Sequence, residues 1–197
     1  MTIDIIGAGI GGLTTAIALE QKGIISRIFE QALQIKEVGA GIILANNAMQ
    51  VYDKLGLRNI IEENGNIIRS TKKEQINTAE ISDLKPTNIW YKENVCLIGD
   101  SAHATTPNMG QGACQAIEDA YVISECLYKY KMRTAFSEYQ KLRLSKAHQI
   151  VKASWIVGKI AHLSNPMLIY MRNQILRLVP SHINRKQNER IFQLAEI

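Results

Sequence analysis

Short apolar runs and stretches of helical periodicity alternate in the first thirty residues of the chain. Residues 2–6 form an apolar run that predicts a strand, residues 11–21 predict a helix, and residues 24–30 predict a second strand. Gly23 supplies the stop signal of the helix. A strand, a helix and a strand joined by short connections are typical of a parallel sheet. We therefore predict an α/β fold with a parallel sheet and helices on both faces.

Helical periodicity dominates the rest of the chain, which contains one further apolar run of strand length. Residues 58–91 carry few structural signals. Asn46 or Asn47 can cap a helix that Gly56 ends, and Ser164-Asn165-Pro166 is a helix start signal. The predicted elements are a helix ending at Leu55, a strand at 95–98, and helices at about 110–128, 134–163, from Pro166 to before Pro180, and within 181–197.

Composition and cysteine usage favour an ordinary globular protein. The 197 residues are 46% hydrophobic and 21% charged, which is enough for one domain or slightly more. The three cysteines form no Cys-x-x-Cys pair, so we expect buried free thiols, a reducing compartment and a cytoplasmic location. No apolar run reaches about 18 residues, and the first strand begins directly after Met1. We therefore expect neither a membrane span nor a signal peptide.

Charge is distributed unevenly along the chain. Residues 1–128 contain 10 Lys and Arg against 15 Asp and Glu, a net charge of −5, whereas residues 129–197 contain 13 against 3, a net charge of +10. A basic tail can bind nucleic acid or an anionic membrane. Here the basic residues are spread along helical stretches, which favours solvated helix faces. We therefore expect no nucleic-acid partner.

A glycine-rich turn connects the first strand to the first helix. Gly7 permits the turn, Gly9 allows the backbone to approach a pyrophosphate, and Gly12 allows the helix to pack closely on the sheet. Glu30 lies 18 positions after Gly12, close to the offset expected for an acid that binds a ribose hydroxyl. The pattern predicts a dinucleotide site and leaves FAD and NAD as alternatives. Its candidate residues are Gly7, Gly9, Ile10, Gly12, Glu30 and Gln31.

A second motif occupies residues 93–112. Asp100 follows the strand, and the amino end of the next helix carries a partial positive charge that favours an electron-rich group. The run Gly-Asp-Ser-Ala-His…Pro-Asn-Met-Gly-Gln-Gly…Ala-Ile-Glu-Asp-Ala resembles the second flavin motif of the FAD-dependent aromatic-ring hydroxylases, the p-hydroxybenzoate hydroxylase-like group A flavoprotein monooxygenases. The resemblance implies that Asp100 contacts the ribityl chain of FAD and that Pro107, Gly110 and Gly112 lie beside the isoalloxazine.

The resemblance extends to residues 39–44 and fails in the interval after them. Gly39-Ala40-Gly41-Ile42-Ile43-Leu44 resembles the glycine-rich strand that flanks the flavin, which makes Gly41 a candidate residue, although the residues alone fit a bulged strand equally well. The Asp-Gly motif of the family is absent from the sequence, and its large substrate sheet is missing within 71–90. We predict a Rossmann-like FAD-binding domain at 1–128 and a C-terminal helical segment at 129–197 packed on it.

The function implied by the resemblance is NAD(P)H- and O2-dependent hydroxylation of a small, aromatic substrate by an FAD-containing enzyme, with a homodimer as a further expectation. The alternative is a truncated flavin-binding fragment that at most oxidises NAD(P)H to form peroxide. A NAD-dependent dehydrogenase is disfavoured by the second motif. We assign no catalytic residue and no metal ligand, because the four histidines lack metal-ligand spacing. We expect His103 to be a structural partner, and Trp90 and Trp155 to be packing residues.

Overall fold

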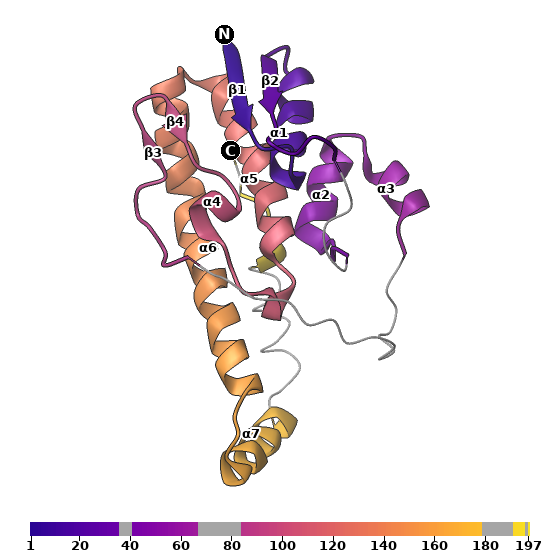
Figure 1. Ribbon diagram of the computed structural model, residues 1–197, viewed down its shortest axis with the longest axis vertical. Coiled ribbons are helices and arrows are strands. Elements are labelled where there is room, and N and C mark those ends of the chain that lie inside the picture. The colour runs from indigo at the N-terminus through magenta and orange to yellow at the C-terminus, as the bar shows by residue number, and fades with distance from the viewer. Residues whose placement is uncertain (36–40, 67–83, 179–190, 196) are drawn as a thin grey trace.

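The computed structural model describes residues 1–35, 41–66, 84–178, 191–195 and 197. Figure 1 shows α5 in the middle of the molecule, with α6 alongside it and α7 beyond the far end of α6. The elements are, in chain order, β1 (Thr2–Ile6), α1 (Ile10–Glu20), β2 (Ile25–Phe29), α2 (Asn46–Lys54), α3 (Arg58–Asn64), β3 (Tyr91–Lys92), β4 (Val95–Cys96), α4 (Asp100–His103), the 3-10 turn η1 (Pro107–Met109), α5 (Gly112–Lys129), α6 (Met132–Ala161) and α7 (Pro166–Leu178).

The predicted strand–helix–strand start is confirmed. β1 and β2 form a two-stranded parallel sheet in which Ile5 lies opposite Ile28. Ile5 is buried on the side of α1, whereas the side chains of Ile6 and Ile25 are 84% and 67% exposed. In the part of the chain that the structure describes, helices therefore cover one face of this sheet. The predicted coverage of both faces is not found there.

The apolar run at 95–98 does not extend the parallel sheet. Only Val95 and Cys96 form a strand, β4, and it pairs antiparallel with β3 across a tight turn at Glu93, whose φ is 51°. The amide of Leu97 donates to the carbonyl of Trp90 at 2.7 Å, which continues the hairpin by one bond. β3, directly before the apolar run, supplies the hydrogen-bond partner of β4. An expectation from hydrophobicity alone that this run lies in the parallel sheet is therefore wrong.

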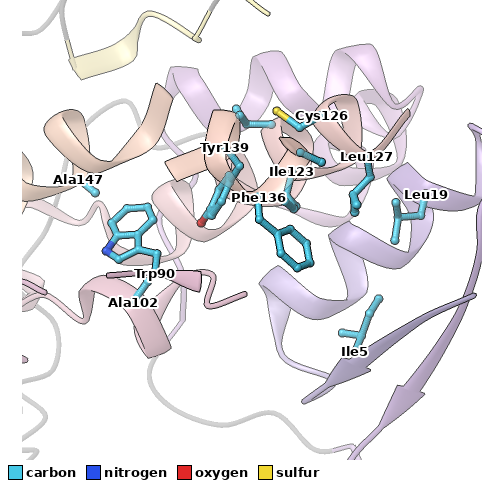
Figure 2. Close-up of a cluster of buried hydrophobic side chains, with 12 residues drawn as sticks. Ile5, Leu19, Trp90, Ala102, Ile123, Cys126, Leu127, Phe136, Tyr139 and Ala147 are labelled. Carbon is cyan, nitrogen blue, oxygen red and sulfur yellow. The ribbon is translucent and has the colours of Figure 1, made fainter. Parts of the chain in front are cut away.

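The main core lies between β1, α1, α5, α6 and the segment that leads into β3. Figure 2 shows Trp90 and Tyr139 in this core, close to Ala102 of α4. Trp90 is fully buried, and its ring centroid lies 5.2 Å from that of His103 and 5.7 Å from that of Tyr139. The packing role predicted for Trp90 is confirmed. The same prediction is wrong for Trp155, which is 50% exposed on the outer side of α6.

The helix starts were predicted with mixed success. Asn165 caps α7, since its side-chain oxygen accepts from the amide of Met167 at 2.9 Å, as predicted. α2 begins after Ala45 without a side-chain cap, so the predicted Asn cap is wrong. Asn47 is buried inside α2, where its amide nitrogen lies 3.2 Å from Oε2 of Glu118. The short helices α3 and α4 were not predicted.

The carboxyl-terminal part is described incompletely. The basic helix predicted within 181–197 falls mostly outside the described residues. None of the helices in the described ranges has an apolar stretch sufficient to cross a bilayer. The division of the chain at residue 128 remains a prediction, although α6 packs along α5 over the central part of the molecule.

Candidate functional site

The glycine-rich turn joins β1 to α1 with the geometry that the motif requires. Gly7 has a φ of 102°, a conformation that favours glycine, and its amide donates to the carbonyl of Phe29 at 2.7 Å. A Cβ at Gly12 would lie 2.1 Å from the carbonyl oxygen of Gly7. The helix can therefore approach the turn this closely only because residue 12 is glycine.

Gly9 differs from Gly12 in having open space beside it. A Cβ at Gly9 would meet no atom within 4 Å, and the residue is the amino-terminal cap of α1 with extended backbone. Ile10 is the first residue of α1 and is partly exposed. Free N–H groups at a helix amino end, with open space in front of a glycine, form the kind of surface that binds phosphate groups.

Glu30 follows β2 and faces the glycine-rich turn. Its Oε2 accepts from the amide of Ala8 at 2.7 Å, and its Oε1 accepts from the amide of Ala32 at 2.8 Å. The hydrogen bond from Ala8 is the main reason that the pKa of Glu30 is lowered. Glu30 is exposed, and so is Gln31 beside it. The acid is thus ionised and held at the edge of the turn, as a ribose-binding carboxylate would need to be.

The second predicted motif begins with a constrained glycine. Gly99 is buried, with a φ of 55° and a ψ of −137°, and its amide donates to Oδ2 of Asp119 at 2.9 Å. Asp100 comes next as the first residue of α4, and its side chain is exposed. The turn therefore fixes the backbone from the inside and presents the Asp100 carboxylate to the outside.

The loop before α5 contains the other predicted residues of this motif. Pro107 begins η1, and Gly110 ends it in the left-handed region with a φ of 61°, its amide donating to the carbonyl of Pro107 at 2.9 Å. Gly112 is the first residue of α5. The cap residue Gln111 makes no side-chain capping bond, and the first turn of α5 holds no acid. The amino end of this 18-residue helix therefore keeps its partial positive charge.

Residues 41–45 pack against this loop without forming a strand. Gly41 has a φ of 113°, and Gly39 and Ala40 lie outside the described residues. A Cβ at Gly110 would lie 3.9 Å from the side chain of Ile43, and the Cys114 thiol donates to the carbonyl of Ile43 at 3.3 Å. Within the described residues 41–44, the glycine-rich strand that was predicted here is not found. The segment does lie beside the second motif, as the resemblance implied.

The two predicted motifs meet on α5. A Cβ at Gly11 would lie 3.3 Å from Cβ of Ala116, and a Cβ at Gly99 would lie 3.0 Å from the same atom. Small residues on all three elements let the glycine-rich turn and the Gly99 turn approach one helix from two sides. A ligand that spans both motifs would thus cross the amino-terminal half of α5. The sequence located both motifs but gave no indication that they meet on this helix.

Sequence reasoning missed the polar contacts behind these turns. Arg143 of α6 is fully buried and bonds to Asp119, and Asn108 of η1 donates to the carbonyl of Ser154 at 3.1 Å. Gly158 allows that second contact, because its missing side chain leaves space for Asn108. An arginine within an amphipathic helix resembles any solvated residue, so the pattern gave no signal. The structural role expected for His103 is supported by its 2.6 Å bond to Asp119.

The titratable side chains of the described residues do not form a metal centre. The described residues contain no group of three or more His, Cys, Asp or Glu side chains that could hold a metal ion. All three cysteines are free, with Cys114 and Cys126 buried as predicted and Cys96 partly buried. Burial raises the pKa of Cys96 to about 12 and that of Cys126 to about 11.

The residues present fit a dinucleotide that carries a flavin. The open position at Gly9, the ionised Glu30 beside the turn, and the uncapped amino end of α5 are each observed in the structure. The sequence also matches the family described as "FAD binding domain" over residues 1–91 and 72–154. The chain therefore belongs to the FAD-binding domain family.

The relatives that the sequence matches include, by name, a monooxygenase/isomerase, a quinolone synthase and an FAD-dependent urate hydroxylase. The chain is 35% identical over 116 residues to aurachin C monooxygenase/isomerase of Stigmatella aurantiaca, which covers 58% of the chain and 30% of that relative. It is 38% identical over 103 residues to 2-heptyl-3-hydroxy-4(1H)-quinolone synthase of Pseudomonas aeruginosa, covering 52% of the chain and 27% of that relative. The match thus spans less than a third of the length of either protein. The resemblance to the FAD-dependent hydroxylases is confirmed.

Solved structures show the same fold. A variant of Klebsiella pneumoniae HpxO complexed with FAD superposes with a TM-score of 0.80 at 16% identity, covering 98% of each chain. HpxO complexed with FAD and uric acid superposes with a TM-score of 0.78 at the same identity, covering 98% of this chain and 96% of the other. Identities this low establish the shared fold and nothing more.

Proposed function

We propose that this chain binds FAD across α5 and belongs to an FAD-dependent monooxygenase that uses NAD(P)H and O2 to hydroxylate a small, aromatic substrate. The observation that carries the proposal is the meeting of the two motifs at Ala116, where Gly11 and Gly99 approach one side chain. The names of the relatives support the reaction class. When bound, FAD would supply the transfer of electrons from NAD(P)H to O2 and of oxygen to the substrate.

The residues of the glycine-rich turn would hold the adenosine diphosphate half of FAD. Gly7, Gly9 and Gly12 shape the turn, and the backbone N–H groups from Ile10 onward would bind the pyrophosphate. Glu30 would exchange its bond with the Ala8 amide for a ribose hydroxyl, and Gln31 lies next to it. The exposed position of both side chains makes this exchange sterically simple.

The second motif would hold the flavin half. Asp100 would accept from the ribityl hydroxyls, because its carboxylate is exposed directly after the Gly99 turn. Pro107, Gly110 and Gly112 would line the ring system, and the amino end of α5 would stabilise negative charge on the reduced flavin. Gly41 would place the backbone of residues 41–45 beside the same region.

A second function, a flavin-binding fragment without hydroxylase activity, is favoured by two specific observations. The chain spans less than a third of the length of the relatives, and Ile6 and Ile25 of the sheet are largely exposed. A hydroxylase has to exclude water around the reacting flavin, since O2 would otherwise be reduced to hydrogen peroxide and no oxygen would reach the substrate. A chain that binds FAD but cannot close this space would be an NAD(P)H oxidase.

Two measurements test these functions in order. The first is FAD binding by the purified chain, followed by the change in flavin absorbance and fluorescence during titration. The second is oxidation of NADH and of NADPH by the FAD-loaded chain, with the peroxide formed measured against the NAD(P)H consumed. Peroxide equal to the NAD(P)H consumed, with every aromatic substrate tested, supports the fragment. Peroxide well below that amount, with a hydroxylated product, supports the monooxygenase.

A further inference from the structure

A buried polar cluster connects α6 to α5. The side chains of Arg143, Glu118, Asp119 and Gln115 are all at most 1% exposed. Arg143 donates from Nε to Oδ1 of Asp119 at 2.7 Å, from Nη1 to Glu118, and from Nη2 to Oε1 of Gln115 at 2.6 Å. The planar guanidinium thus uses all three of its nitrogens on α5, which a lysine could not do.

Asp119 connects this cluster to the Gly99 turn. Its Oδ1 faces Arg143, while its Oδ2 accepts from the amide of Gly99 at 2.9 Å and lies 2.6 Å from Nε2 of His103. Both oxygens of one carboxylate are therefore occupied, one toward α6 and the other toward the turn and α4. Figure 1 shows α4 next to α5 and α6, where this contact is made.

The charge of Asp119 depends on its partners. Burial by itself would disfavour the carboxylate, but the charge of Arg143 and the hydrogen bonds from His103 and Arg143 outweigh that effect and hold the pKa of Asp119 well below its usual range. Hydrogen bonds that an ionised carboxylate accepts are about twice as strong as neutral ones. The Gly99 amide is therefore held by a charged acceptor whose ionisation Arg143 maintains.

The hydrogen bond from Gly99 to Asp119 holds the backbone directly before Asp100 in an unusual conformation. Gly99 has a φ of 55° and a ψ of −137°, and it packs against Ala116 closely enough that a Cβ would lie 3.0 Å away. Its amide bond to Asp119 fixes the residue directly before Asp100. A rotation at Gly99 would therefore change the direction in which the exposed Asp100 carboxylate leaves the turn.

A gain in stability alone does not explain this buried polar cluster. Replacing a buried ion pair with apolar residues of similar volume often leaves stability unchanged or raises it. The arrangement orients the Gly99 turn, because it places one charged oxygen of Asp119 at the Gly99 amide. Glu118 has a second cation beside Arg143, since Nζ of Lys146 lies 2.7 Å from one of its oxygens and 2.8 Å from the other.

We propose that Arg143, acting through Asp119 and the Gly99 amide, is a positioning residue that orients Asp100 toward the flavin half of bound FAD. The inference rests on the proposed FAD binding. Arg143 itself touches no part of the candidate site surface, because it is fully buried behind α5. Its hydrogen bonds lead to the second motif, through Asp119 and the Gly99 amide.

A double-mutant cycle on FAD affinity tests this directly. In the wild-type background, Asp100→Ala is expected to weaken FAD binding about tenfold. In an Arg143→Met background, where Asp100 is no longer oriented, the same change is expected to weaken binding less than about twofold. Glu30→Ala is the matched control, because Glu30 belongs to the other motif, and its effect should be the same in both backgrounds.

The outcomes separate the inference from the function on which it rests. No saturable FAD binding by the wild type would refute the proposed function. The positioning role would be overturned if Asp100→Ala and Arg143→Met had full, additive effects on FAD affinity. It would also be overturned if the Arg143→Met background reduced the effects of Glu30→Ala and Asp100→Ala equally, because that would indicate general damage to the site. If Arg143→Met does not fold, Asp119→Asn serves as the second background, with the same coupling expected to Asp100 and absent to Glu30.

Discussion

Gly12 is the position where the structure makes the sharpest prediction about a single substitution. A Cβ at this residue would lie 2.1 Å from the carbonyl oxygen of Gly7, 3.2 Å from its carbon and 3.3 Å from Cγ2 of Ile5. Non-bonded heavy atoms prefer separations of about 3.5–4.0 Å, so α1 would have to move by more than about 1 Å in Gly12→Ala. Overpacking of this kind costs about 1–3 kcal/mol of the free energy of unfolding.

The expected cost is measurable by thermal unfolding. For a chain of this size, about 1–3 kcal/mol corresponds to a fall in Tm of about 2–12 °C. Gly9→Ala is the matched control, because a Cβ there meets nothing within 4 Å and the backbone at φ −71° and ψ 177° suits alanine. We expect Gly9→Ala to keep or slightly raise Tm, by analogy with unstrained glycine replacements worth about 0.4–1 kcal/mol.

The two variants should differ again in FAD affinity. Gly12→Ala disturbs the turn, and Gly9→Ala places a methyl group where we expect the pyrophosphate, so both should weaken binding. Only Gly12→Ala should also unfold more easily. Circular dichroism melting and flavin titration on the same preparations check both statements. An unchanged Tm for Gly12→Ala would refute the packing argument, and wild-type FAD affinity in Gly9→Ala would refute the assignment of the pyrophosphate site.

Three further predictions concern the exposed acid of the second motif, the buried acid behind it and the thiols. Asp100→Ala should weaken FAD binding by about 1–3 kcal/mol without lowering the Tm of the FAD-free chain, because the Asp100 side chain is exposed; a lower Tm would contradict this. Because the pKa of Asp119 is lowered in the folded chain, its carboxylate stabilises the fold above its unfolded pKa, and this contribution is lost as the pH falls below about 4. The free energy of unfolding in urea, measured against pH, should therefore fall less steeply at acid pH in Asp119→Asn than in the wild type. An unchanged slope would argue against this role of Asp119. Cys96 and Cys126, with pKa values raised to about 12 and about 11, should react slowly with a thiol reagent at about pH 8 until the chain is unfolded, and rapid labelling of the native chain would contradict their burial.

The local elements and the motifs were predictable because each leaves a periodic or glycine-based signal. The strand–helix–strand start, the long helix α6 and the Asn165 cap of α7 all depend on residues close together in sequence. The pairing of residues 95–98 was not predictable, since hydrophobicity does not specify which strand will be the partner. The Glu93 turn decided that pairing in favour of a local hairpin.

The candidate site was predictable in its residues more than in its geometry. Glycine spacing located the turn at Gly7, and the end of an apolar run together with the family resemblance marked Asp100. Neither signal carries information about the helix on which the two motifs meet. The contact made by Ala116, a residue of the quoted motif, and the role of Arg143 were missed for the same physical reason. An alanine that permits close approach and an arginine that is buried by its partners look, in sequence, like ordinary helix residues.

The central claim is that this chain binds FAD across the two motifs that meet on α5, and an equilibrium titration of the purified chain with FAD tests it most directly. Isothermal titration calorimetry, together with quenching of flavin fluorescence, gives both affinity and stoichiometry. We predict saturable binding of one FAD per chain, lost in Gly9→Val and weakened in Asp100→Ala. Absence of saturable binding by a folded wild-type chain, or equal binding by the wild type and Gly9→Val, would contradict the account.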